Sequence, residues 1–148
     1  MLYFAYGSNL SHQQMKKRCK DSKYIKNFFL DGYKLSFCSI NKSYGFANII
    51  KQSNSKVPGC IWEISLIDER ELDYYEGFPI RYDKDFFLLN HKKVMYYIIK
   101  RQYLFNPPTR MYIDVINQGY KDCNIDSEYL KKELKQYNIY LWSISTIS

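Results

Sequence analysis

A glutamate at the end of a predicted helix is the side chain in this sequence best suited to acid–base chemistry. Ser65 is a typical N-cap residue, and Gly77 is the residue type that ends a helix. Asp68 and Glu69 lie in the first turn between them, where the helix dipole favours carboxylates. Glu76 falls in the last turn, where the negative end of the dipole and burial among aromatic neighbours disfavour its charge. We expect its pKa to be raised, which suits a general acid or base.

A short loop near the N-terminus is the second candidate for chemistry. The apolar stretch 2–6 is typical of a buried strand, and the turn-forming residues 7–10 (GSNL) follow it directly. Ser11, with Gln14 three residues later, has the spacing of a capping box and predicts the start of a helix. A strand, a tight loop and a helix in this order expose backbone N–H groups that can hold an anion or a polarised carbonyl oxygen.

The elements that must position these residues are strands placed before and between helices. We expect helices over 12–20, 65–76 and 110–118, with Gly119 ending the third, and a last helix to 136 capped by Asp126 or Ser127. We expect strands over 34–40, 46–51, 57–64, 85–90 and 93–100, with an edge or bulge at Pro58-Gly59. The segment 24–29 should lead to a turn at Asp31-Gly32, and 52–56 should form a loop. The tail 137–148 is expected to add a strand or to pack on the barrel through 139–142. This order indicates an α+β fold, a small and partly open mixed-strand β-barrel flanked by helices.

Length and composition indicate one domain over residues 1–148. Hydrophobic residues make up 46% of the 148 residues, which is ordinary for a globular protein, and the 16 Tyr and 9 Phe suit strands and aromatic-lined pockets. No apolar run approaches the roughly 20 residues of a membrane span, so we expect no membrane association. The first residues form a strand with no charged segment before it, unlike a signal peptide. We therefore expect a cytosolic protein.

Cysteine and histidine spacing argues against a metal site or a nucleophile–histidine pair. The two histidines fall in the first turn of a helix and in a hairpin turn, at His12 and His91. The four cysteines lie far apart without a CxxC pattern, which favours free, mostly buried thiols. They are Cys19, Cys38, Cys60 and Cys123.

The net charge of +7 raises the alternative of polyanion binding. Its densest clusters lie on two predicted helices, at Lys16, Lys17, Arg18 and Lys20 and at Lys131, Lys132 and Lys135. Solvated helix faces explain both clusters, which leaves weak binding of nucleic acid as the lesser reading.

Two distant motifs resemble those of the γ-glutamylcyclotransferase-like (AIG2-like) family. They are the stretch 3–10 (YFAYGSNL) and the stretch 72–77 (LDYYEG) with Tyr82 downstream. Weaker agreements at 47–50, 59–64, 96–99 and 107–112 extend the resemblance over about residues 2–135. It implies a mixed-strand barrel with a pocket at its mouth.

The resemblance also implies a role for each matching residue. Glu76 corresponds to the catalytic acid/base. The substrate-binding residues would be Tyr6, Gly7, Ser8, Asn9 and Leu10 in the loop, with Ser8 and Asn9 as side-chain donors, and the pocket tyrosines Tyr82 and Tyr112. No metal and no cofactor are implied.

The implied reaction is a cyclising C–N lyase, or cyclotransferase, reaction on a small γ-glutamyl amide. The substrate's own α-amine attacks the γ-carbonyl, so the enzyme supplies geometry and protons, and the products are 5-oxoproline and a free amine or amino acid. Glu76 would take the α-ammonium proton and deliver one to the departing amine.

Two other functions remain open at this stage. One is a non-catalytic barrel that binds a small γ-glutamyl or carboxylate ligand, and the other is a basic, Tyr-rich barrel that binds nucleic acid. The sequence does not indicate the leaving group, the pathway, the oligomeric state, or whether the γ-glutamyl group is free or linked to a carrier or protein. Arg81 lies between the glutamate motif and Tyr82, where it either contacts an acidic leaving group or faces water.

Overall fold

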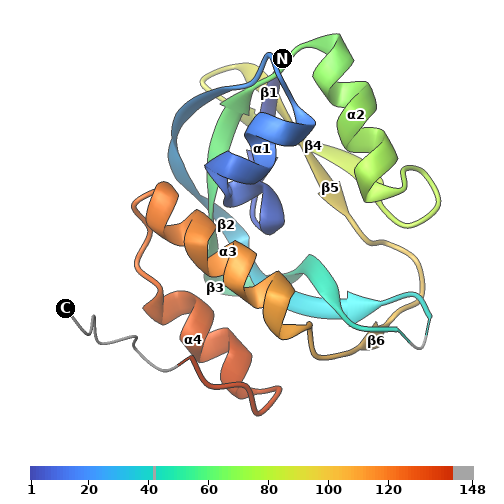
Figure 1. The fold of residues 1–148 in the computed structure, drawn as a ribbon, viewed down its shortest axis with the longest axis vertical. Helices are drawn as coiled ribbons and strands as arrows, with labels where there is room; N and C mark the ends of the chain where they lie inside the picture. The colour runs from blue at the N-terminus through green and yellow to red at the C-terminus, as the bar shows by residue number, and fades with distance from the viewer. Residues whose placement is uncertain (42, 142–148) are drawn as a thin grey trace.

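Six strands form one curled, mixed sheet with helices packed around it (Figure 1). The structure, a computed structural model, describes residues 1–41 and 43–141. The sheet order is β4-β5-β1-β3-β2-β6, with β1 parallel to β5 and the other neighbours antiparallel. The strands are β1 (Leu2–Ala5), β2 (Lys23–Ser39), β3 (Phe46–Glu63), β4 (Asp83–Leu89), β5 (Lys92–Ile98) and β6 (Leu104–Phe105). A 3-10 helix η1 (Ser8–Leu10) precedes α1 (His12–Arg18), α2 (Leu66–Glu76), α3 (Arg110–Asp122) and α4 (Glu128–Lys135).

Aromatic contacts across the interior show how strongly the sheet curls. Phe28 in β2 stacks on Phe87 in β4 with ring centroids 5.5 Å apart, although three strands separate β2 from β4 in the sheet. The ring of Phe4 in β1 meets both of them edge-on. The strands therefore enclose a core as an open barrel does, and the predicted α+β class with a partly open mixed-strand barrel is confirmed.

The long hairpin β2–β3 replaces the three predicted strands 34–40, 46–51 and 57–64 and takes in the segment 24–29. The predicted turn at 31–32 and loop at 52–56 are wrong as breaks, because both lie within the strands and form a register shift between Asp31 and Tyr33. Gly32 has φ +83° there, and the exposed polar side chains opposite it need no separate loop. Pro58 does not mark an edge, since β3 lies between β1 and β2; it lies just beyond Cys60, where the pairing with β1 ends.

Helix α2 has the predicted bounds and the predicted caps. Ser65 accepts a hydrogen bond from the backbone N–H of Asp68, whose side chain bonds back to the Ser65 N–H, and Gly77 ends the helix with φ +66°. Glu76 is therefore the last residue of α2. The capping box and the glycine together fix where this helix stops.

Gly119 does not end α3 as predicted, because the helix continues to Asp122. Gly119 is buried, and a Cβ there would lie 2.4 Å from the Leu10 Cβ and 2.7 Å from the Ser11 nitrogen. The glycine thus permits α3 to contact the backbone that leads from η1 into α1. This contact ties α3 to the loop that carries the candidate site.

The described part of the C-terminal tail contains no strand. Ile139 and Leu141 are partly buried against the core, so this part of the tail packs on the rest of the fold. The predicted contribution of Trp142 lies outside the described residues.

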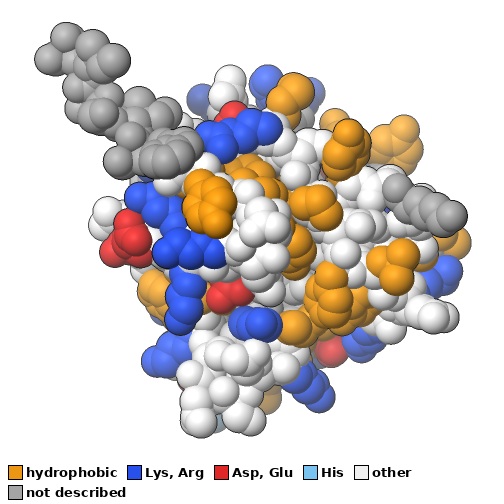
Figure 2. Space-filling view, turned by 90° about the horizontal axis from the view of Figure 1, so that it is seen from below, with side chains coloured by type: hydrophobic (Ala, Val, Ile, Leu, Met, Phe, Trp, Pro, Cys, Tyr) orange, Lys and Arg blue, Asp and Glu red, His pale blue; other side chains and the backbone are white. Residues whose placement is uncertain are grey.

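The surface carries its positive charge in a mixed setting. Figure 2 shows Lys and Arg side chains along one side of the lower face, with Asp or Glu side chains between them and hydrophobic side chains across the other side. The four cysteines are buried and free, as predicted. Of the helices that the structure describes, none is long and apolar enough to cross a membrane.

Candidate active site

The loop after β1 turns sharply and leaves backbone donors at its first residues. Leu10 N–H donates to the Gly7 oxygen and Ser11 N–H to the Ser8 oxygen, both at 3.1 Å. Among residues 1–41 and 43–141, neither the Ser8 nor the Asn9 backbone N–H donates a hydrogen bond to another described group. A Cβ on Gly7 would lie 2.9 Å from the Ala47 Cβ, so the glycine lets the loop lie against β3. These first-turn donors are the groups a helical turn offers to an anion or oxyanion.

Asn9 connects the loop to the candidate catalytic carboxyl group. Its Nδ2 donates to Glu76 Oε1 at 3.2 Å and to the Tyr3 hydroxyl at 3.0 Å. Its Oδ1 accepts from Arg18 Nη1 at 2.7 Å, and its backbone oxygen accepts from Trp62 Nε1 at 3.0 Å. With both ends of its amide and its carbonyl engaged, Asn9 holds one orientation toward Glu76.

The Glu76 carboxyl group lies in a pocket of tyrosines at the end of α2. Of the aromatic residues expected around it from the sequence, Tyr74, Tyr75, Phe78 and Tyr82, only Tyr82 lines this pocket, and Tyr74 is 82% exposed. The residues that do are Tyr3, Tyr6, Gly7, Ser8, Asn9, Ala47, Glu76, Tyr82, Tyr97 and Tyr112. Burial raises the pKa of Glu76 to about 7, against the opposing effects of Arg18, Arg81 and the Asn9 hydrogen bond. The predicted direction of the pKa shift is confirmed, with burial as its cause.

The pocket tyrosines are fixed by backbone groups of the sheet. Tyr6 donates to the Tyr97 carbonyl at 2.6 Å, and Tyr82 donates to the Ala47 carbonyl. Tyr112 differs, because its hydroxyl oxygen accepts from the Ala47 N–H at 3.1 Å. Burial raises the pKa of the Tyr6, Tyr82 and Tyr112 hydroxyl groups, so all three stay protonated at neutral pH. The Tyr112 hydroxyl proton has no acceptor among the residues that the structure describes and can serve a ligand.

The fold brings seven of the eight sequence-predicted residues to one pocket. Tyr6, Gly7, Ser8, Asn9, Glu76, Tyr82 and Tyr112 all line it. Leu10 does not, because its side chain is fully buried in the core against Gly119. Its contribution is to anchor the end of the loop.

Arg18 belongs to this site, although the sequence placed it on a solvated helix face. Its Nη1 donates to Asn9 Oδ1 and, at 3.3 Å, to Ser8 Oγ, and its guanidinium lies 4.6 Å from the centre of the Tyr75 ring. The signal was its position three residues after the buried Met15, which places both on neighbouring parts of one helix face. Tyr3 and Tyr97 were also missed, because a chain with 16 Tyr offers no way to single them out.

Replacing Arg18 with glutamine is expected to raise the pKa of Glu76 further above 7 by about one unit, because it removes a positive charge that favours the carboxylate. The pKa can be measured by following the Glu76 carboxyl carbon in NMR spectra against pH. Arg70→Gln, on an exposed part of α2, is the matched control and should leave the titration unchanged. An unaltered Glu76 titration in the Arg18 variant would contradict this coupling.

The pocket continues outward into a wider cavity. The inner pocket has a volume of about 30 Å³, and the outer cavity, which shares Ser8, Glu76, Tyr82 and Tyr112 with it, about 160 Å³. The outer cavity is further lined by Arg18, Tyr75, Phe46, Arg81, Gln14 and Val115. A ligand larger than a water molecule that reaches Glu76 must therefore also occupy the outer cavity.

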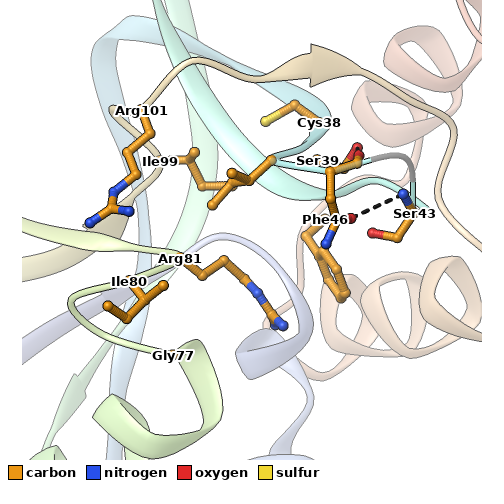
Figure 3. Close-up of a pocket in the computed structure, with 11 residues that line it drawn as sticks. Cys38, Ser39, Ser43, Phe46, Gly77, Ile80, Arg81, Ile99 and Arg101 are labelled. Carbon is orange, nitrogen blue, oxygen red and sulfur yellow. Dashed lines mark hydrogen bonds between the residues drawn. The ribbon is translucent and has the colours of Figure 1, made fainter.

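Arg81 separates the outer cavity from a third, neighbouring hollow (Figure 3). Its guanidinium lies 4.8 Å from the centre of the Phe46 ring, and both residues also line this hollow of about 290 Å³. Arg101 enters the same hollow from the other side and donates to the Pro79 carbonyl at 3.4 Å. The three volumes form a series that runs from Glu76 past Arg81.

This arrangement is suited to proton transfer beside a stabilised oxyanion. A carboxyl group with a pKa of about 7 can both accept and donate a proton near neutral pH. The free N–H groups of Ser8 and Asn9 and the Tyr112 hydroxyl supply donors nearby. Within residues 1–41 and 43–141, no three His, Cys, Asp or Glu side chains group as metal ligands.

Comparison with known proteins gives a consistent family. Residues 3–120 match the family described as "Gamma-glutamyl cyclotransferase, AIG2-like". The human protein named gamma-glutamylcyclotransferase is 26% identical over 155 aligned positions, which cover 88% of this chain and 76% of the human protein.

Solved structures share the fold. One named gamma-glutamyl cyclotransferase superposes with a TM-score of 0.75 at 23% identity, covering 98% of this chain and 90% of its own. An uncharacterized human protein, loc79017, gives a TM-score of 0.74 at 24% identity, and the superposition covers 98% of this chain and 93% of that protein. YkqA from Bacillus subtilis gives a TM-score of 0.74 at 19% identity, and the superposition covers 95% of this chain and 55% of YkqA. At these identities the superpositions show the fold alone.

Proposed function

Because the chain belongs to the gamma-glutamyl cyclotransferase, AIG2-like family, we propose that it cyclises a small γ-glutamyl amide and releases 5-oxoproline and a free amine or amino acid. The observation that carries the proposal is the Glu76 carboxyl group. It has a pKa of about 7 and is hydrogen-bonded by Asn9 to the loop whose free N–H groups can bind an oxyanion.

The proposed chemistry begins with removal of a proton from the substrate's α-ammonium group. The Glu76 carboxylate accepts this proton, and the freed α-amine attacks the γ-carbonyl carbon to close a five-membered ring. The new bond joins the α-nitrogen to the γ-carbon. As the bond from that carbon to the leaving nitrogen breaks, Glu76 returns the first proton to the leaving nitrogen, and the new ring nitrogen gives up its second proton, which the free amine takes up as it departs as an ammonium ion. The carboxyl group ends the cycle as it began, so the step needs no oxidant or reductant.

The remaining site residues are assigned to binding and charge stabilisation. The Ser8 and Asn9 N–H groups would stabilise the negative charge that develops on the γ-carbonyl oxygen. Tyr112 can donate its free hydroxyl proton, while Tyr6 and Tyr82 are committed to backbone carbonyls and shape the pocket. Asn9 and Arg18 hold the loop in position relative to the Glu76 carboxyl group.

The pH dependence of the reaction is expected to follow the ionisation of Glu76. Only the carboxylate accepts the first proton, so kcat/KM should fall about tenfold per pH unit below the Glu76 pKa of about 7 and level off above it. Initial rates of 5-oxoproline release between pH 5 and 8 measure this. A rate that stays constant from pH 5.5 to 7.5 would show that no group with this pKa takes part.

A panel of γ-glutamyl amino acids, γ-glutamyl amines and glutathione tests the activity directly. Release of 5-oxoproline from any member supports the cyclotransferase and identifies the class of leaving group. If folded protein binds members of the panel without releasing product, a non-catalytic binding barrel explains the site instead. The cytosolic location and the single-domain organisation remain predictions.

A further inference from the structure

The outer cavity beside Glu76 carries two arginines, Arg18 and Arg81, whose charge lowers the pKa of the Glu76 carboxyl group without an ion-pair contact to it. Within the part of the chain that the structure describes, no carboxylate lies within ion-pair distance of Arg18 or Arg81. Each guanidinium instead lies over an aromatic ring, Arg18 over Tyr75 and Arg81 over Phe46. Stacking fixes the two planes while leaving N–H groups free for a ligand.

The two arginines differ in how much of their hydrogen-bonding capacity is used. Arg18 donates through Nη1 to Ser8 and Asn9, which ties it to the loop. The Arg81 guanidinium donates no hydrogen bond to any described residue, although its backbone N–H donates to the Gly77 carbonyl. Arg81 comes from the segment that follows α2 and lines both outer hollows. An unpaired, stacked guanidinium at the exit of a pocket is a receptor for a carboxylate.

The cavity also provides the apolar surface that a short aliphatic chain needs. Phe46, Tyr75 and Val115 form part of its walls. The larger hollow beyond Arg81 adds Ile80 and Ile99. A leaving group that starts at Glu76 thus enters a cavity lined by both apolar side chains and two guanidinium groups.

We propose that the outer cavity binds the leaving group of the substrate and favours a dicarboxylic one, an acidic amino acid attached to the γ-glutamyl group, with Arg81 binding its side-chain carboxylate. This inference rests on the proposed function, because only a cleaved substrate has a leaving group. It goes beyond that function by naming the substrate class. Arg18, with its remaining N–H groups, faces the same cavity and is placed to bind the main-chain carboxylate. A γ-glutamyl amine without carboxylates leaves both guanidinium groups without an anionic partner.

A pair of nearly isosteric substrates tests the proposal. γ-Glutamyl-glutamate and γ-glutamyl-glutamine differ by one side-chain charge and share every other group. Arg81 is exposed, so water weakens its attraction. We expect kcat/KM for 5-oxoproline release to favour γ-glutamyl-glutamate about fivefold to tenfold, mainly through KM. In Arg81→Gln this ratio should fall to about one, and in the matched control Arg70→Gln it should stay as in the wild type.

Equal kcat/KM values for the two substrates in the wild-type protein would overturn the proposal. A loss in Arg81→Gln that is the same for both substrates would also overturn it, because Arg81 would then bind a group that the two substrates share.

Binding to a Glu76→Gln protein separates this inference from the proposed reaction. Calorimetric titration with the same two dipeptides needs no turnover, and the expected ratio of dissociation constants is again about fivefold to tenfold in favour of γ-glutamyl-glutamate. If this ratio is found but wild-type protein releases no 5-oxoproline, the cyclotransferase proposal fails and the acidic-ligand site stands. If the two ligands bind equally, or neither binds, the inference fails whatever the activity.

Discussion

Glu76→Gln is expected to lower kcat/KM for 5-oxoproline release by about 10²- to 10⁴-fold, the largest effect of any single change in the site. Glutamine keeps an oxygen that can accept from Asn9, so the loop and the pocket should keep their geometry. What it loses is the group that exchanges a proton near pH 7. Steady-state rates for the wild type and the variant on the same γ-glutamyl substrate measure the loss.

Stability provides the internal control for this variant. The raised pKa of Glu76 means that the folded state holds its proton more tightly than the unfolded state does, so this group lowers stability as pH rises from about 4.5 to about 7. Glu76→Gln should therefore be at least as stable as the wild type at pH 8, and the difference should disappear below pH 4.5. The exposed neighbour Glu71→Gln should alter neither rate nor stability. Activity within tenfold of wild type in folded Glu76→Gln protein would remove Glu76 from the mechanism.

Gly119→Ala is expected to destabilise the protein by about 2 to 3 kcal/mol, although alanine favours a helix more than glycine does. The added methyl group would lie 2.4 Å from the Leu10 Cβ and 2.7 Å from the Leu10 carbonyl carbon, and neither atom can rotate away. The helix or the loop must move to relieve this overlap. Thermal unfolding should show a Tm lower by about 5 to 10 °C.

Gln118→Ala is the matched control, one residue away on the exposed side of α3. It adds a small gain in helix propensity, loses only the exposed hydrogen bond from Gln118 to Asp122, and does not meet the loop. Its Tm should therefore change by no more than about 2 °C. Should Gly119→Ala match this control, the close contact between α3 and the loop would not be a stabilising feature. Because Leu10 ends the candidate binding loop, Gly119→Ala is also expected to weaken substrate binding.

The sequence predicted the elements whose ends are specified by residues close to them in the chain. Ser65, Asp68 and Gly77 specify both ends of α2 by capping, which depends on residues within a few positions. The continuity of β2 and β3 could not be predicted in this way. Asp31-Gly32 has a typical turn composition, yet the two strands continue past it through a register shift between the pairs Asp31–Lys56 and Tyr33–Lys51. Gly119 was misjudged for the same reason, because its role depends on Leu10, more than 100 residues away.

One residue of the candidate site was predictable because its position within an element determines its chemistry. Glu76 stands out because a carboxylate at the C-terminal end of a helix is electrostatically disfavoured. Arg18 did not stand out, since its sequence neighbours Lys16 and Lys17 are exposed and only the folded loop supplies Asn9 as its partner. The cavities beyond Glu76 depend on how Phe46 and Arg81 meet, and no local pattern encodes that contact.

The central position of β1 gives the site a defined place in the order of folding. The pairs β2–β3 and β4–β5 are neighbours in the chain and can form early, whereas β1 joins them by pairing Leu2 with both Glu63 and Val94. Such long-range closure costs chain entropy before it gains contacts, so it comes late. Asn9, in the loop after β1, donates to Glu76 at the end of α2, so the site needs β1 in place. A growing chain in which β5 has not yet been synthesised can therefore contain α2 and Glu76 without the complete candidate site.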